Sequence, residues 1–152
     1  MALSKITNNM VSVSGVPVDS IIQIVEDSTN TAESTTATSS YTTSALSVNI
    51  TPSSTSSKIL VMVHLQTYNN TTDASTFYDL FKDGSRLTTA GNAIRHFISG
   101  GSGVSSGSFT YLDSPATTSQ VTYDIRYYVS AGSGWISVNQ GESSIIAMEI
   151  AG

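Results

Sequence analysis

Apolar and small polar residues alternate one by one along much of this chain. In the run 46–51, the apolar members are Leu46, Val48 and Ile50, and Ser or Asn separates them. A period of two places alternate side chains on opposite faces of an extended strand. An amphipathic helix would instead need apolar residues three and four positions apart. The pattern therefore predicts β-strands, each with one buried face.

Runs of this kind recur between turn-rich segments, which predicts an antiparallel all-β fold. The polar segment 52–57 predicts that the run ending at Ile50 pairs with the next run, and Asp83-Gly84 is a favoured hairpin turn. The glycine-rich segment 100–107 predicts a loop, and the Thr/Ser-rich segment 29–44 suits an edge strand. The expected strands cover Ile21–Val25, Leu46–Thr51, Ile59–Tyr68, Phe77–Phe81, Arg86–Leu87, Ala93–Ile98, Phe109–Leu112, Val121–Val129, Trp135–Val138 and Ser144–Ile150.

Short strands at this spacing, with no helical segment, are typical of a β-sandwich, and above all of a jelly roll. We expect the sandwich over residues 21–152. Residues 1–20 scatter single apolar residues through a short polar leader, which predicts an extended N-terminal docking arm. A disordered tail is the alternative. The candidate anchoring residues of the arm are Leu3, Ile6, Met10, Val11 and Val13.

The last expected strand, Ser144–Ile150, is apolar on both faces apart from Glu149. A strand with one solvated face should show more polar residues. Two interpretations remain open. Either the strand is central and covered on both faces, or its second face meets another subunit, which we favour. The candidate residues of a trimer interface are Ile145, Ala147, Met148 and Tyr127.

The composition limits the class of protein. The chain has 152 residues, enough for one domain with its own hydrophobic core. It has no cysteine, so neither a disulfide framework nor a thiolate metal site is expected. Charged residues make up only 11% of the chain, whereas a typical soluble domain has about 25%. Ser and Thr replace them, which predicts a neutral, hydroxyl-rich exterior.

The charge pattern bears on possible partners. The formal net charge is −5, and the six Lys and Arg residues are scattered along the chain. Nucleic-acid binding needs clustered cations, so nucleic acid is not an expected partner. The longest apolar run has about six residues, too few to span a bilayer, and the leader lacks the apolar core of a secretory signal. We expect no membrane insertion and an exit route other than secretion, such as release within a virus particle.

No pattern of reactive residues meets the needs of catalysis. Gly103–Gly107 matches Gly-x-Ser-x-Gly, but that chemistry needs a histidine after the serine, and both histidines precede Ser105. His64 and His96 show no metal-ligand spacing. The carboxylates form no recognisable glycosidase pair. We therefore expect no enzyme activity, no bound metal and no cofactor.

Aromatic residues beside polar loops are the best binding signal. Tyr68 precedes the loop 69–73, and Trp135 follows a Gly-Ser-Gly turn. Tyr and Trp combine an apolar face with a polar group, which suits both protein interfaces and sugar rings. Burial of Trp135 in the core is an equal alternative. The candidate receptor-binding residues are Tyr68, Asn69, Asn70, Trp135 and Asn139.

Three segments, 50–63, 111–118 and 144–150, resemble parts of bacteriophage structural proteins, which are common in phages of aquatic bacteria. The leader Met1–Ile6 also resembles the N-termini of tail fibres. The resemblance implies a trimer of jelly-roll heads, similar to the heads of the C1q and tumour-necrosis-factor group. Fibre proteins usually carry a long shaft between leader and tip. Here the leader meets the head almost directly, which favours a short spike or a capsid-decorating knob.

Together these features predict a non-enzymatic protein on the virion surface. We expect a homotrimeric knob whose arm holds it to another phage structural protein, in the tail or the capsid. The favoured role is a short tail fibre or spike tip that binds a host-surface glycan or protein with threefold avidity. Capsid decoration is the alternative, and a polysaccharide depolymerase is a distant third.

Overall fold

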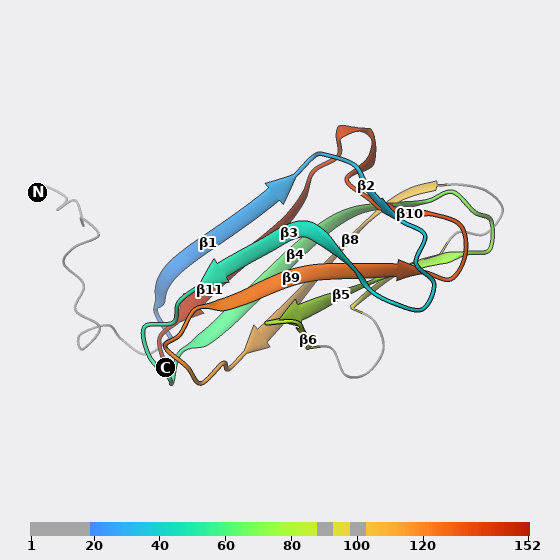
Figure 1. Ribbon diagram of the computed structural model, residues 1–152. Helices are drawn as coiled ribbons and strands as arrows, with labels where there is room; N and C mark the ends of the chain where they lie inside the picture. Colours follow the sequence, from blue (N-terminus) through green and yellow to red (C-terminus); the bar gives the residue numbers. More distant parts are fainter. Residues whose placement is uncertain (1–18, 88–92, 98–102) are drawn as a thin grey trace, which may run out of the picture.

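The computed structural model describes residues 19–87, 93–97 and 103–152. Within these ranges the chain forms eleven strands in two antiparallel sheets that pack face to face (Figure 1). The predicted antiparallel β-sandwich is confirmed. None of the helices in the described ranges has the length and apolarity that a membrane crossing requires. The candidate anchoring residues of the arm lie outside the described residues.

The first sheet, here called sheet A, is built around the long strand β4. One edge of β4 pairs with β8, while the other edge pairs with β11 and then, further along, with β10. β1 borders β11, and β2 borders β10. Its strands are β1 (Ile21–Thr29), β2 (Glu33–Thr35), β4 (Lys58–Asn69), β8 (Gly103–Asp113), β10 (Gly134–Ile136) and β11 (Ser143–Ile150).

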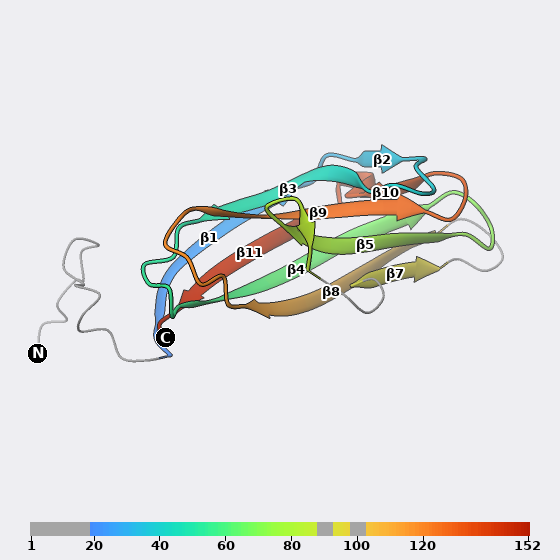
Figure 2. The ribbon, with the colours of Figure 1, turned by 60° about the horizontal axis from the view of Figure 1, so that its bottom comes forward.

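The second sheet, sheet B, has the order β3–β9–β5, and the far edge of β5 pairs with β7 and β6 in turn. Its strands are β3 (Thr42–Ile50), β5 (Ser75–Lys82), β6 (Ser85–Arg86), β7 (Ile94–Phe97) and β9 (Val121–Val129). Figure 2 shows β3, β9 and β5 as one layer beside the layer of β1, β11, β4 and β8. The arrangement β1–β11–β4–β8 against β3–β9–β5–β7 is an eight-stranded jelly roll, to which β2, β6 and β10 are short additions.

One predicted pairing is wrong. β3 and β4 do not form a hairpin, because Ile50 pairs with Val121 of β9, and β4 pairs with β8, β10 and β11. The connection 51–57 crosses from sheet B to sheet A instead. A polar segment shows that the chain reverses, but it does not show which strand the chain meets next. The loop is tied to Glu149, whose Oε1 accepts bonds from the backbone N–H and the hydroxyl of Ser53, both at 2.6 Å.

Two further predictions concern glycines. The Asp83-Gly84 hairpin is confirmed: both residues have positive φ, and they join β5 to β6. The loop expected over 100–107 is wrong for residues 103–107, which form the first part of β8 and pair with the far half of β4. A run of Gly and Ser lacks the alternation that identifies a strand, so only the pairing partner could reveal it.

The core lies between the inner faces of the two sheets. Every second residue of β3, β4, β9 and β11 points into it, as the alternation predicted. Three fully buried tyrosines, Tyr78, Tyr123 and Tyr127, fill its centre, and the hydroxyls of two of them donate hydrogen bonds. Tyr78 donates to the carbonyl of Trp135 at 2.9 Å, and Tyr123 donates to Asp113 at 2.6 Å. Burial, together with the Asp113 carboxylate, raises the pKa of Tyr123, so it remains a neutral donor.

Candidate functional site

The outer face of sheet A changes in character along β4. The outward positions are every second residue of β4 from Leu60 to Tyr68. Near the C-terminus these positions and their neighbours are aliphatic, in the middle they carry hydroxyls and a histidine, and at the far end they are aromatic. We call these zones the apolar patch (Ile24, Leu60, Met62, Leu112, Ile146 and Met148), the hydroxyl band (His64, Ser108 and Ser144) and the aromatic pair (Tyr68 and Trp135).

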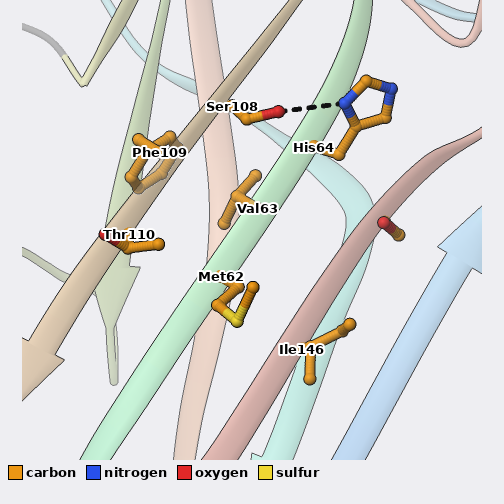
Figure 3. A pocket seen from close by; sticks show the side chains of 8 residues that line it. Met62, Val63, His64, Ser108, Phe109, Thr110 and Ile146 are labelled. Carbon is orange, nitrogen blue, oxygen red and sulfur yellow. Dashed lines mark hydrogen bonds between the residues drawn. The ribbon is translucent and has the colours of Figure 1, made fainter.

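The apolar patch has no second layer of described residues above it. The exposed fraction is 55% for Ile24, 52% for Leu112 and 37% for Met62. Between β4, β8 and β11 the face is hollowed into a shallow depression of about 370 Å³. Figure 3 shows Met62 and Ile146 at this depression, on adjacent strands. A contiguous exposed apolar surface of this kind is typical of a protein interaction site.

The hydroxyl band contains His64, whose Nδ1 lies 3.0 Å from the Ser108 hydroxyl (Figure 3). The other histidine, His96, lies on β7 of sheet B and is only 8% exposed. Burial lowers the pKa of His96, which favours the neutral ring. The two side chains lie on opposite sides of sheet A and do not converge. In the described part of the chain, no group of three His, Cys, Asp or Glu side chains could hold a metal ion.

Ser105 lies inside β8, opposite Thr67 of β4. The backbone there is an extended strand, whereas a hydrolase serine in Gly-x-Ser-x-Gly occupies a sharp turn from a strand into a helix. The sequence match therefore does not create a nucleophile elbow.

β10, which carries Trp135 of the aromatic pair, lies at the end of the sandwich opposite the C-terminus (Figure 1). Tyr68 and Trp135 are cross-strand neighbours on β4 and β10, with ring centroids 5.0 Å apart and ring planes inclined by 57°. Both side chains are half-buried on the outer face. Trp135 therefore does not fill the core. Paired, tilted rings with polar edges form a platform on which a sugar ring can stack.

The three asparagines expected at the receptor site have different environments. Asn69 is fully buried; its Nδ2 donates to Thr76 at 3.0 Å, and its Oδ1 accepts the N–H of Thr71 at 2.8 Å. It shapes the loop and cannot reach a receptor, which corrects that assignment. Asn70 is exposed, and its Oδ1 accepts the N–H of Ser133 at 2.9 Å. Asn139 is also exposed and has a φ of 53° in a short 3-10 turn after β10.

The expected trimer-interface residues need a similar correction. Ile145, Ala147 and Tyr127 lie in the sandwich core and are at most 1% exposed, so they have no surface to offer a second subunit. Met148 lies on the outer face, in the apolar patch. β11 is central in its sheet, as one interpretation held, yet no described layer covers its second face. The alternation did not show which of the two apolar faces of β11 points inward.

A second surface, which the sequence pattern did not predict, lies on the outer face of sheet B. There Tyr41, Phe77, Tyr128 and all three arginines of the chain lie together. The sequence holds a signal for it. In the run 121–129 the residues between the buried Val, Tyr and Ile positions include Asp124, Arg126 and Tyr128.

Comparison with known proteins relates the fold to viral proteins. No protein-family model and no curated protein sequence matches the chain. A structure from the Gx strain of infectious bursal disease virus aligns with a TM-score of 0.59 and 13% identity, over 100% of this chain and 37% of that chain. The VP2 subviral particle of the same virus aligns with a TM-score of 0.50 and 12% identity, over 89% of this chain and 34% of that chain.

The chain thus spans about a third of the length of these viral chains. At such low identity the likeness concerns the fold. The class of this protein is a jelly-roll β-sandwich, of the kind that these virus proteins also contain.

Proposed function

We propose that this chain is a non-enzymatic structural protein of a virus particle. The observation that carries the proposal is the jelly roll itself, which extends over the described chain and aligns with chains of infectious bursal disease virus, including VP2 of a subviral particle. The low share of charged residues fits an exterior that makes many weak, non-covalent contacts. The resemblance of three segments to phage structural proteins favours a bacteriophage as the virus.

The proposed form is a homotrimeric knob at the virion surface. The apolar patch is the proposed contact between copies, because burying its aliphatic side chains against another copy would contribute about 25 cal/mol per Å². Its charged neighbours are few: Lys58 pairs across the strands with Ile150, and Glu26 with Ile146. The N-terminal arm is the proposed link to the particle.

Host attachment is the proposed role of the opposite end. Tyr68 and Trp135 form an aromatic platform there, and the exposed side chain of Asn70 lies on the adjoining loop. Asn139 is exposed on the turn after β10 and adds a polar contact. In a trimer three weak sites would act together, which raises avidity about a hundredfold or more without new contacts. A short tail fibre or spike tip would use the knob in this way.

Decoration of a capsid is the second candidate. It is favoured by the alignment with VP2 of a subviral particle, which is an assembly of protein copies. The number of copies per particle separates the two roles, since tail appendages hold tens of copies and a shell holds hundreds.

Quantitative mass spectrometry of purified virus particles, combined with imaging of the labelled protein, tests the proposal. We expect the chain to be present in stoichiometric amount and at the particle surface. Absence of the chain from purified particles would refute a structural role. Shortening of a host polysaccharide by the purified protein would support a depolymerase in its place.

A further inference from the structure

The outer face of sheet B gathers all three arginines of the chain, although the molecule as a whole is acidic. Arg86 lies on β6, Arg95 on β7 and Arg126 on β9. All three strands pair with β5, so one continuous surface carries the three guanidinium groups. We call it the arginine–aromatic face; its other members are Tyr41, Phe77, Asp79, Phe81, Phe97, Asp124 and Tyr128.

The rings of this face form a connected series. The ring centroids of Phe97 and Phe77 both lie 5.5 Å from the guanidinium carbon of Arg95. Phe77 stacks on Tyr128 with centroids 4.6 Å apart, and Tyr128 meets the edge of Tyr41 at 5.0 Å. Phe97 is exposed and the other three rings are half-buried, and the series has Arg95 at one end and Arg86 over Tyr41 at the other. Such a row of rings and cations is suited to a ligand laid across the strands.

The charges on the face are unevenly matched. Arg86 pairs with Asp79 at 2.8 Å, and Arg126 pairs with Asp124 at 2.5 Å. Arg95 donates from Nε to the Ser75 hydroxyl at 3.0 Å, and no carboxylate among the described residues pairs with it. The face therefore has one surplus positive charge. The planar edge of the Arg95 guanidinium is a preferred partner for a carboxylate.

A depression of about 350 Å³ lies beside the rings. Its walls are Tyr41, Tyr128, Arg86 and the hydroxyl-bearing residues Thr38, Ser39 and Ser40. This volume falls in the range of small-ligand sites. Hydroxyls together with an aromatic wall match the hydroxyls and the apolar face of a sugar ring.

We propose that the arginine–aromatic face binds an acidic oligosaccharide. One sugar ring occupies the depression against Tyr128, and a carboxylate further along the oligosaccharide pairs with Arg95. A single surplus charge is too little for a nucleic acid, whose binding depends on the neutralisation of many phosphates. The inference rests on the proposed attachment to a host surface and names the class of ligand.

A glycan array carrying uronic-acid and sialic-acid oligosaccharides, each with its neutral analogue, tests the inference on the purified full chain. We expect binding to carboxylated members only, at least tenfold weaker in Arg95→Gln and in Tyr128→Ala. Arg95→Lys should restore part of the affinity, because it keeps the charge but loses the planar fork. The matched control is Lys58→Gln on sheet A, which should bind as the wild type does.

Thermal unfolding of each variant shows whether the fold is intact. Arg95→Gln should melt close to the wild-type temperature, because the side chain is exposed and loses only contacts at the surface. The proposal is overturned if no carboxylated glycan binds, if binding survives Arg95→Gln, or if a single-stranded oligonucleotide competes equally well. A loss of binding in Trp135→Ala alone would move the ligand to sheet A. None of these results depends on whether the chain is found in virus particles, so the two proposals fail separately.

Discussion

The two sheets share one core but have unlike outer faces. On sheet A, outward residues such as Met62, Ile146 and Leu112 are aliphatic, and no described layer covers them. On sheet B, the outward residues Asp79 and Phe81 are almost fully buried by neighbouring rings and arginines. The aliphatic side chains of the first face stay exposed in this chain, whereas most charged groups of the second face pair with one another.

The contrast shows how one strand pattern supports two kinds of surface. Aliphatic side chains stabilise a structure by leaving water, so a row of exposed ones is stabilising only when a second surface covers it. A network of rings, guanidinium groups and carboxylates is held by stacking and ion pairs inside one subunit. Such a network can present a rigid surface to a soluble ligand. We therefore assign self-association to the apolar patch of sheet A and the binding of an acidic oligosaccharide to the arginine–aromatic face of sheet B.

The largest difference between the faces should appear in stability. The carboxylate of Asp79 is fully buried and accepts bonds from Arg86, Tyr41 and the backbone N–H of Ala93. Asp79→Ala should lower the free energy of unfolding by about 3 kcal/mol, because it leaves a charge and two donors without their partner. Met62→Ala, at an outward position of sheet A, should cost about 1 kcal/mol or less. An equal loss of unfolding free energy in the two variants, measured by urea denaturation, would contradict the proposed difference between the two faces.

Charge placed in the apolar patch should abolish self-association. The double variant Met62→Glu with Ile146→Glu should weaken association about 100-fold or more, because carboxylates would be buried without partners. Sedimentation velocity across a range of concentrations measures the effect. Phe97→Glu is the matched control, since Phe97 is 50% exposed on sheet B. A wild-type protein that stays monomeric at high concentration would contradict the assignment of sheet A.

Acid should weaken the fold through Glu149. Burial alone would raise the pKa of Glu149, but hydrogen bonds from Ser53 and Gln23 lower it below the ordinary value of 4.5. The carboxylate therefore stabilises the fold fully above about pH 4.5, and this contribution is lost as the pH falls toward the lower pKa of the folded state.

Glu149→Gln should reduce stability at pH 7 by about 1.5 kcal/mol and flatten the acid limb of the stability curve. Urea denaturation between pH 3 and pH 7 measures both effects. The hydroxyl of Ser53 offers a weaker control: Ser53→Ala removes one of the bonds and keeps the charge. If the free energy of unfolding of the wild type does not decrease as the pH drops below 4.5, Glu149 is not the acid-sensitive group.

The smallest change in stability should come from the aromatic pair. Trp135→Ala removes one ring of a half-buried pair and should cost about 1 kcal/mol. If the pair contacts a host surface, the same variant should still lower attachment of the virus to cells. Tyr68→Phe, which keeps the ring and removes the hydroxyl, separates stacking from hydrogen bonding. Attachment that is unchanged in Trp135→Ala would leave the arginine–aromatic face as the remaining candidate.

Predictions from the sequence succeeded where local chemistry decides. The alternation in 46–51 and 121–129 identified strands and their inward residues, and Asp83-Gly84 identified a hairpin because its two residues tolerate positive φ. Predictions failed where the outcome depends on a distant partner. Asn69 is polar and adjoins a loop, yet it is buried and donates a hydrogen bond to Thr76. Residues 103–107 form a strand because they pair with β4.

Where the alternation is clear, the sequence alone determined the kind of element and with it the class of fold, because a period of two and the turn residues act over a few neighbouring positions. Tertiary structure alone decided which strands are neighbours and which face of β11 points inward. It also brought Arg86, Arg95 and Arg126 from separate segments onto one surface. β11 is apolar on both faces, so its period of two holds no information about which face meets the core.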